Sequence, residues 1–155
     1  MYPFHQGDSS AAFQFLTDSG ITYIVEFSDA SGYFDNDCVL CQSIEAVAFS
    51  PIGSKGKFDA QIRETICDII RQRCVNNGVA IVFICDQSGG HSRHKVFTAW
   101  DAEFNGGQFH FQPAEIVHPG GILYTGMIVQ TKNPNSGHYL GEFRNNMNLI
   151  QAKLN

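Results

Sequence analysis

The feature that most constrains this fold is the apolar run at residues 79–85, which lies between a predicted helix and a glycine-containing loop. An unbroken run of mainly β-branched and aromatic residues predicts a strand that is buried on both faces. Residues 59–77 predict the helix, with Asp59 as its N-cap and Gly78 as its C-terminal stop. A helix between two strands implies a right-handed crossover, so the buried strand should pair in parallel with an earlier strand at 43–50.

Further strands and a helix flank this crossover. Residues 12–16 and 21–27 are rich in aromatic and β-branched residues and surround a turn sequence, which predicts an antiparallel hairpin. The amphipathic stretch 95–104 predicts a helix after the buried strand. Residues 108–111 and 122–129 predict two more strands.

The C-terminal segments complete the expected order. The two late strands should be connected through Pro113 and a turn at 118–121, and apolar residues at helical spacing from Ser136 onward predict a last helix. The resulting order is β-β-β-α-β-α-β-β-α. We therefore predict a single α+β domain over residues 1–155, with a mixed β-sheet and helices packed on it.

Composition narrows the function classes. The chain has 155 residues, of which 43% are hydrophobic, so it can build a core without metal or disulfide staples. A net charge of −5 argues against bulk nucleic-acid binding, which needs clustered basic residues. No signal peptide and no membrane-spanning run are expected. The odd number of scattered cysteines favours reduced thiols in the cytoplasm: Cys38, Cys41, Cys67, Cys74 and Cys85.

The loop after the buried strand is the main candidate for a binding site. Asp86 follows the strand directly, and Gly89 and Gly90 can adopt positive φ and leave backbone N–H groups free. Ser88 and Arg93 add side-chain donors, and the start of the next helix adds a partial positive charge. This combination suits phosphate or carboxylate. The alternative is structural: Ser88 caps the helix and the glycines only turn the chain.

The position of Arg93 on its helix supports this site. In a helical projection Arg93 lies on the same face as the aromatic stripe of Phe97, Trp100 and Phe104. An arginine on the core side needs a partner, because burying an unpaired charge is costly. We predict that Arg93 contacts Asp86, an aromatic ring or a bound anion.

Two kinds of chemistry have weaker support. Asp86 with His91 or His94 could act as an acid–base pair in a small hydrolase or nuclease-like enzyme, but no nucleophile motif accompanies it. The two histidines lack a third metal ligand, and Cys38 and Cys41 lack a second cysteine pair. We therefore expect no metal and no cofactor, and ordinary buried thiols at Cys38 and Cys41.

The chain also resembles a family of short, uncharacterised bacterial proteins of the Bacteroidetes type. The resemblance extends through about two thirds of the chain, as far as Phe104, and is carried by an opening motif and a central Ile-Cys-Asp … Arg-x-x-x-Phe-x-x-Trp motif. The loop after Asp86 looks shorter here than in that family. The family has no assigned activity, so the resemblance implies a bacterial cytoplasmic protein and no reaction. The matching residues are Phe15, Thr17, Gly20, Tyr23, Val25, Phe27, Ile84, Cys85, Asp86, Arg93, Phe97 and Trp100.

These observations favour a non-enzymatic binding module. It would engage a protein partner or a small anionic ligand through residues 86–94 and the adjoining aromatic surface. Enzymatic activity is left undecided, with the absence of a catalytic motif weighing against it. The sequence indicates no oligomeric state.

Overall fold

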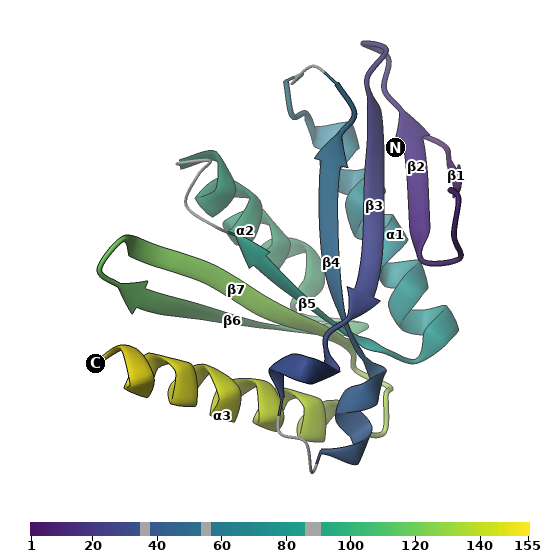
Figure 1. Cartoon of the computed structure of the whole chain (residues 1–155). Helices are drawn as coiled ribbons and strands as arrows, with labels where there is room; N and C mark the ends of the chain where they lie inside the picture. Colours follow the sequence, from purple (N-terminus) through teal and green to yellow (C-terminus); the bar gives the residue numbers. More distant parts are fainter. Residues whose placement is uncertain (35–37, 54–56, 86–90) are drawn as a thin grey trace.

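The computed structural model describes residues 1–34, 38–53, 57–85 and 91–155, and for Val39, Cys85 and residues 91–97 it describes the backbone only. Strands and helices alternate along the chain much as the sequence predicts (Figure 1). Their order is β1 (Phe4–Gln6), β2 (Ala12–Leu16), β3 (Thr22–Asp29), η1 (Ser31–Tyr33), η2 (Val39–Ser43), β4 (Ile44–Pro51), α1 (Ala60–Asn77), β5 (Ala80–Cys85), α2 (His91–Phe104), β6 (Phe109–His118), β7 (Gly121–Gln130) and α3 (Ser136–Leu154).

The strands form one mixed sheet of seven strands in the order β1-β2-β3-β4-β5-β7-β6. Neighbouring strands are antiparallel except β4 and β5, which are parallel and joined by α1. This parallel pair is the predicted crossover, and the hairpin of β2 and β3 is also confirmed. The predicted α+β class is therefore correct.

The ends of α1 are set by the residues that the sequence indicates. The Asp59 side chain accepts a hydrogen bond from the Ile62 amide at 2.8 Å, which satisfies a donor that the helix itself leaves free. At the other end Gly78 adopts the left-handed conformation, with φ 62° and ψ 29°. Glycine takes this conformation without the steric penalty of a Cβ atom, so the chain can leave the helix and enter β5 at once.

The sheet is covered on both faces. Alternate residues of β5 point to opposite sides, so Ile81 and Phe83 pack in one core cluster and Ala80 and Val82 in the other. The first cluster contains the buried apolar residues of α1 together with Trp100 and Phe104 of α2, and the second contains Tyr139 and Phe143 of α3. The sheet thus separates α1 and α2 on one face from α3 on the other, which explains why residues 79–83 are apolar without alternation. Coverage ends there, because the next residue, Ile84, is 53% exposed.

Two features differ from the sequence prediction. The short strand β1 pairs with β2 and was not predicted. The predicted strand at 108–111 is longer, because β6 continues through Pro113 to His118 instead of ending before a connecting segment. Proline cannot donate a hydrogen bond to a neighbouring strand. It is tolerated here because β6 is the edge strand, with β7 as its only neighbour in the described sheet.

A partly buried ion pair fastens α1 to the sheet. The Arg73 guanidinium donates to both carboxylate oxygens of Glu45 on β4, at 2.7 and 2.8 Å. The same guanidinium lies over the Phe27 ring, 5.2 Å from its centroid. The hydrogen bonds to Glu45 raise the pKa of Arg73. A bidentate pair of this kind fixes orientation as well as distance, and so it sets the angle of α1 across the strands.

At Gly126 on β7 the core has no space for a side chain. The rings of Phe83 and Phe111 stack with centroids 5.6 Å apart and lie over this residue. A Cβ atom at Gly126 would meet the Phe111 ring at 2.6 Å and the Phe83 ring at 2.8 Å. Both rings are buried, so neither can swing away without disturbing its neighbours.

We expect Gly126→Ala to lower the free energy of unfolding by about 1–3 kcal/mol, the usual cost of overpacking a filled core. Gly141→Ala is the matched control, because Gly141 lies inside α3 and a Cβ atom there would meet nothing within 4 Å. That control should be neutral or stabilising by up to about 1 kcal/mol, since alanine favours helix. Urea denaturation of the three proteins measures both changes. Equal stability of Gly126→Ala and the wild type would contradict the packing described here.

Candidate functional site

The most distinctive part of the sheet is the end at which the parallel strands β4 and β5 have their carboxyl termini. The two strands pair only from Ile44 to Ala46 on β4 and from Ala80 to Val82 on β5. Beyond these residues β4 continues against β3 as far as Pro51, and β5 continues against β7 as far as Cys85. The strands therefore diverge toward their carboxyl ends (Figure 1). Because they are parallel, the connections from β4 to α1 and from β5 to α2 both start at this end of the sheet.

An aromatic group lies where the strands diverge. Trp100 of α2 contacts Phe49 of β4, with ring centroids 5.9 Å apart, and Phe83 of β5, with centroids 4.7 Å apart. Phe58, just before α1, lies 6.4 Å from Phe49 and is 36% exposed. Trp100 itself is 1% exposed, and its indole Nε1–H has no hydrogen-bond acceptor in the part of the chain that the structure describes. A buried donor without an acceptor is costly, so packing of the ring against Phe49 and Phe83 must offset that cost.

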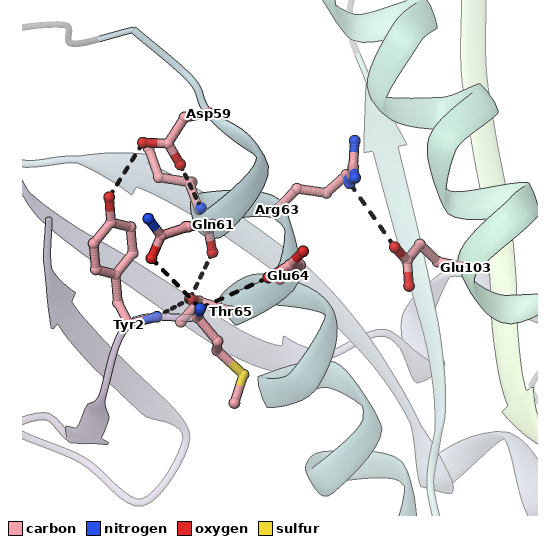
Figure 2. Close-up of polar contacts among 9 residues, drawn as sticks. Tyr2, Asp59, Gln61, Arg63, Glu64, Thr65 and Glu103 are labelled. Carbon is pink, nitrogen blue, oxygen red and sulfur yellow. Dashed lines mark hydrogen bonds and ion pairs between the residues drawn. The ribbon is translucent and has the colours of Figure 1, made fainter.

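The start of α1 is already occupied by the protein's own side chains (Figure 2). While one carboxylate oxygen of Asp59 caps the helix, the other accepts a hydrogen bond from the Tyr2 hydroxyl at 3.2 Å. The Tyr2 amide donates to the Thr65 hydroxyl at 2.8 Å, so the N-terminal segment is held against the helix. Burial raises the pKa of Tyr2, and the hydrogen bond to Asp59 raises it further. A carboxylate at this helix start leaves little room for a second anion.

The C-terminal half of α2 is fixed to α1. Arg71 donates to the Glu103 carboxylate at 2.9 Å and to the Glu103 backbone carbonyl at 3.1 Å. Arg63 approaches the same carboxylate at 4.0 Å (Figure 2). The Arg71 guanidinium also lies over the Phe104 ring, 4.9 Å from its centroid. These contacts and the burial of Trp100 hold the helix that follows the candidate loop.

The residues that the sequence singles out for binding or catalysis all belong to the connection between β5 and α2. Asp86, Ser88, Gly89 and Gly90 lie outside the described residues. The backbone of His91, Arg93 and His94 forms the start of α2, but their side chains lie outside the described part. The predicted strand–loop–helix unit is confirmed by its two ends, and the helix begins at His91, earlier than the sequence pattern predicts. The contacts proposed for Arg93 stay a prediction.

Two buried cysteines can be excluded as nucleophiles. Cys67 and Cys74 lie on the buried face of α1 and are free thiols. Burial raises the pKa of each thiol from 9.0 to about 12, so hardly any thiolate is present near neutral pH. In the unfolded chain these thiols would ionise near 9.0. Between that pH and about 12 the folded form binds more protons, so the free energy of unfolding falls as the pH rises.

The sequence-based interpretation of Cys38 and Cys41 was wrong. Instead of two ordinary buried thiols, the structure has a disulfide between them at η2, with Cα atoms 5.3 Å apart. His138 of α3 lies beside it, with its Nε2 atom 3.4 Å from the Cys38 sulfur. The Cys-x-x-Cys spacing was visible in the sequence, but no sequence signal connects it to a histidine so far along the chain.

A cavity on the opposite face of the sheet was also not predicted. It has a volume of about 180 Å³ and lies between α3, η1 and the strands β5, β6 and β7. Among the described residues its lining is almost wholly apolar, with polar side chains only at Tyr33, Thr125 and Asn146. The Thr125 hydroxyl already donates to the Phe83 carbonyl at 2.6 Å. This cavity offers hydrophobic contact and little else, so it adds no chemistry to the candidate site.

These features define a class of protein: an α+β domain with a mixed sheet, in which the connections to α1 and α2 both start at the end of the sheet where the parallel strands diverge. The chain belongs to DUF6169, a family of unknown function, which matches residues 58–145. The match begins just before α1 and ends within α3, so it includes β5, α2 and the connection between them, but not β4 or most of the segment that joins β4 to α1. The expected membership of an uncharacterised family is confirmed.

Other comparisons add little. A comparison with curated proteins finds no match. Among solved structures, the CoA-dependent acyl-homoserine lactone synthase MesI is similar with 12% sequence identity and a TM-score of 0.40, over 91% of this chain and 71% of that chain. A TM-score this low carries no conclusion about activity. None of the helices in the described part has the length and hydrophobicity that crossing a membrane requires.

We expect Cys67 and Cys74 to resist alkylation in the native protein at about pH 8. With a pKa of about 12 for each, the thiolate fraction is on the order of 10⁻⁴, and burial blocks access as well. Brief treatment with iodoacetamide, followed by mass-spectrometric mapping, measures the modification of each cysteine. The protein unfolded in guanidinium chloride is the control and should be modified at both positions. Comparable modification of native and unfolded protein would contradict the burial of these thiols.

Proposed function

We propose that the protein is a binding module that holds a small anionic ligand at the carboxyl ends of β4 and β5. The observation that carries this proposal is the short pairing of these strands, which ends at Ala46 and Val82. Where neighbouring parallel strands end and their crossover connections leave the sheet, ligands commonly bind in α/β folds. Here the two strands also diverge, so the segments that follow β4 and β5 start apart from each other.

The start of α2 is the better of the two helix starts for an anion. Asp59 already places a carboxylate at the start of α1. The segment before α2 instead carries the residues predicted to bind, namely Ser88, Gly89, Gly90 and Arg93. Backbone N–H groups, a helix dipole and a guanidinium together suit a phosphate or a carboxylate. The protein has a net charge of −5, so an anion needs such a local concentration of positive charge.

The aromatic group suggests that the ligand is more than a bare ion. Phe58 is 36% exposed and lies beside Phe49, which in turn contacts Trp100 at the same end of the sheet. An apolar or planar part of a ligand could pack there while its anionic group binds at α2. A nucleotide or another organic phosphate has both kinds of group.

The enzymatic alternative uses the same segment. A small hydrolase would employ Asp86 with His91 or His94, and these side chains lie outside the described part. Among the described residues, the buried thiols Cys67 and Cys74 are not usable nucleophiles, because burial raises the pKa of each to about 12. No observation therefore favours hydrolysis over binding. Release of phosphate from the ligand during the experiment below would identify an enzyme.

Ligand binding should raise the melting temperature, and Arg93→Ala should remove most of that rise. A ligand at about 100 times its dissociation constant stabilises the folded state by roughly 2.7 kcal/mol, which corresponds to on the order of 5–10 °C for a domain of this size. Differential scanning fluorimetry with inorganic phosphate, sulfate and a panel of nucleotides measures the shift. The quantity to compare is the rise caused by ligand in each protein, because Arg93→Ala can also change the stability without ligand.

Arg144→Ala is the matched control. Arg144 is an exposed arginine on α3, which covers the other face of the sheet. The control should show the same ligand-induced rise as the wild type. An equal rise in Arg93→Ala and the wild type would place the anion elsewhere. No rise with any member of the panel would leave the capped turn as the better interpretation of this loop.

We also propose a cytoplasmic location. Two of the cysteines, Cys67 and Cys74, are free and buried, which suits a compartment that keeps thiols reduced. In such a compartment the Cys38–Cys41 disulfide would be reduced to two thiols for most of the time. Fractionation of the source cells, followed by immunodetection, tests this location, and recovery of the protein outside the cytoplasm would contradict it.

A further inference from the structure

Three metal-ligating side chains meet at a place that the proposed ligand site does not include. Cys38 immediately precedes η2, Cys41 lies within it, and His138 lies in the first turn of α3. Their ligand atoms all lie within 4.8 Å of one another. The residues come from segments 100 positions apart in the sequence, so only the packing of α3 beside η2 brings them together.

The donor set and spacing match those of a zinc site. Two thiolates and an imidazole are preferred zinc ligands, and oxygen-binding ions such as Mg²⁺ and Ca²⁺ favour carboxylates instead. Zinc holds sulfur at about 2.3 Å and nitrogen at about 2.0 Å, so in a tetrahedral site the two ligand atoms are about 3.5 Å apart. The Cys38 sulfur and the His138 Nε2 atom are 3.4 Å apart. His138 is thus already beside the pair, at a separation close to the one that zinc requires.

The two cysteines must be reduced before they can bind a metal. In the structure their sulfur atoms are joined as a disulfide. A cellular dithiol can reduce it by exchange: the dithiol becomes a disulfide, and Cys38 and Cys41 each receive one hydrogen. The sulfur atoms then have to move to about 3.8 Å apart, the separation of two thiolates on one tetrahedral zinc. Binding of Zn²⁺ releases the two thiol protons to solvent.

We propose that Cys38, Cys41 and His138 form a Zn²⁺ site in the reduced protein. The site has three protein ligands among the described residues, and water would take the fourth position. The sequence-based expectation of no metal at this pair depended on the absence of a second cysteine pair, and His138 supplies a third ligand of another kind. A bound ion would connect η2 to α3, and so it would hold α3 at its N-terminal end. This proposal is independent of anion binding at α2.

The experiment uses the full chain, reduced with a phosphine under nitrogen. The phosphine is converted to its oxide with oxygen from water, and each cysteine gains a hydrogen. Zinc content is measured by elemental analysis after gel filtration, and affinity by competition with a chromophoric chelator. Co²⁺ is the spectroscopic probe, because thiolate ligation of cobalt gives an intense charge-transfer absorption in the near ultraviolet. The variants are Cys38→Ser and His138→Ala, with His110→Ala as the control, since His110 is an exposed histidine on β6.

We expect one zinc ion per chain in the reduced wild type and in His110→Ala, together with the cobalt charge-transfer band. His138→Ala should weaken zinc binding by more than the roughly 10–100-fold that loss of an outer hydrogen-bond partner of a metal site costs. Cys38→Ser should lose the zinc and most of the cobalt band, and the oxidised wild type should bind neither ion. Circular dichroism checks that each variant is folded.

Two results would overturn the proposal. The first is a reduced wild type that retains no zinc and gives no thiolate–cobalt band, a measurement that needs no variant. The second is a folded His138→Ala with the zinc affinity of the wild type, which would show that the histidine is not a ligand.

Discussion

The short parallel ladder between β4 and β5 is the constraint on which the rest of the structure depends. It joins an N-terminal group of four antiparallel strands to a C-terminal group of three. Glu45 lies in this ladder, opposite Ile81, and its carboxylate binds Arg73 of α1. The crossover helix is therefore held to the same few residues that hold the sheet together. Because the ladder is short, the two groups of strands can diverge beyond it, and the candidate site lies where they do.

Much of this fold follows from local sequence signals. Asp59 and Gly78 bound a helix through capping chemistry that acts over a few residues. The apolar run after Gly78 is a strand as predicted, and it is buried on both faces as far as Phe83. The prediction is wrong where tertiary context decides. Pro113 looks like the end of a strand, yet it lies within β6 because the edge of the sheet does not need its missing N–H. The strand β1 is too short to show a period and forms only because β2 is there to pair with it.

The candidate sites divide in the same way. The connection between β5 and α2 is predictable because a buried strand, glycines and an amphipathic helix follow one another directly. The role of Trp100 is only half predictable: the sequence places it on the core face, but its contacts with both Phe49 and Phe83 depend on how β4 and β5 diverge. The approach of His138 to Cys38 is outside the reach of any local pattern, since it results from the docking of α3. Local sequence patterns therefore predict sites at the ends of helices and strands, but they do not predict sites formed by segments that are distant in the sequence.

The shortness of the β4–β5 ladder also has a consequence for how the chain folds. The hairpins β2–β3 and β6–β7 close over small sequence separations, so they can form early, whereas the ladder requires α1 to form and cross first. An intermediate in which both groups of strands are formed but not yet joined would expose one free edge on β4 and another on β5. Such free edges can pair with the matching edges of a second molecule. The two chains then exchange one group of strands, which is domain swapping. Refolding at high protein concentration should therefore favour domain-swapped dimers, in which α1 crosses from one molecule to the other.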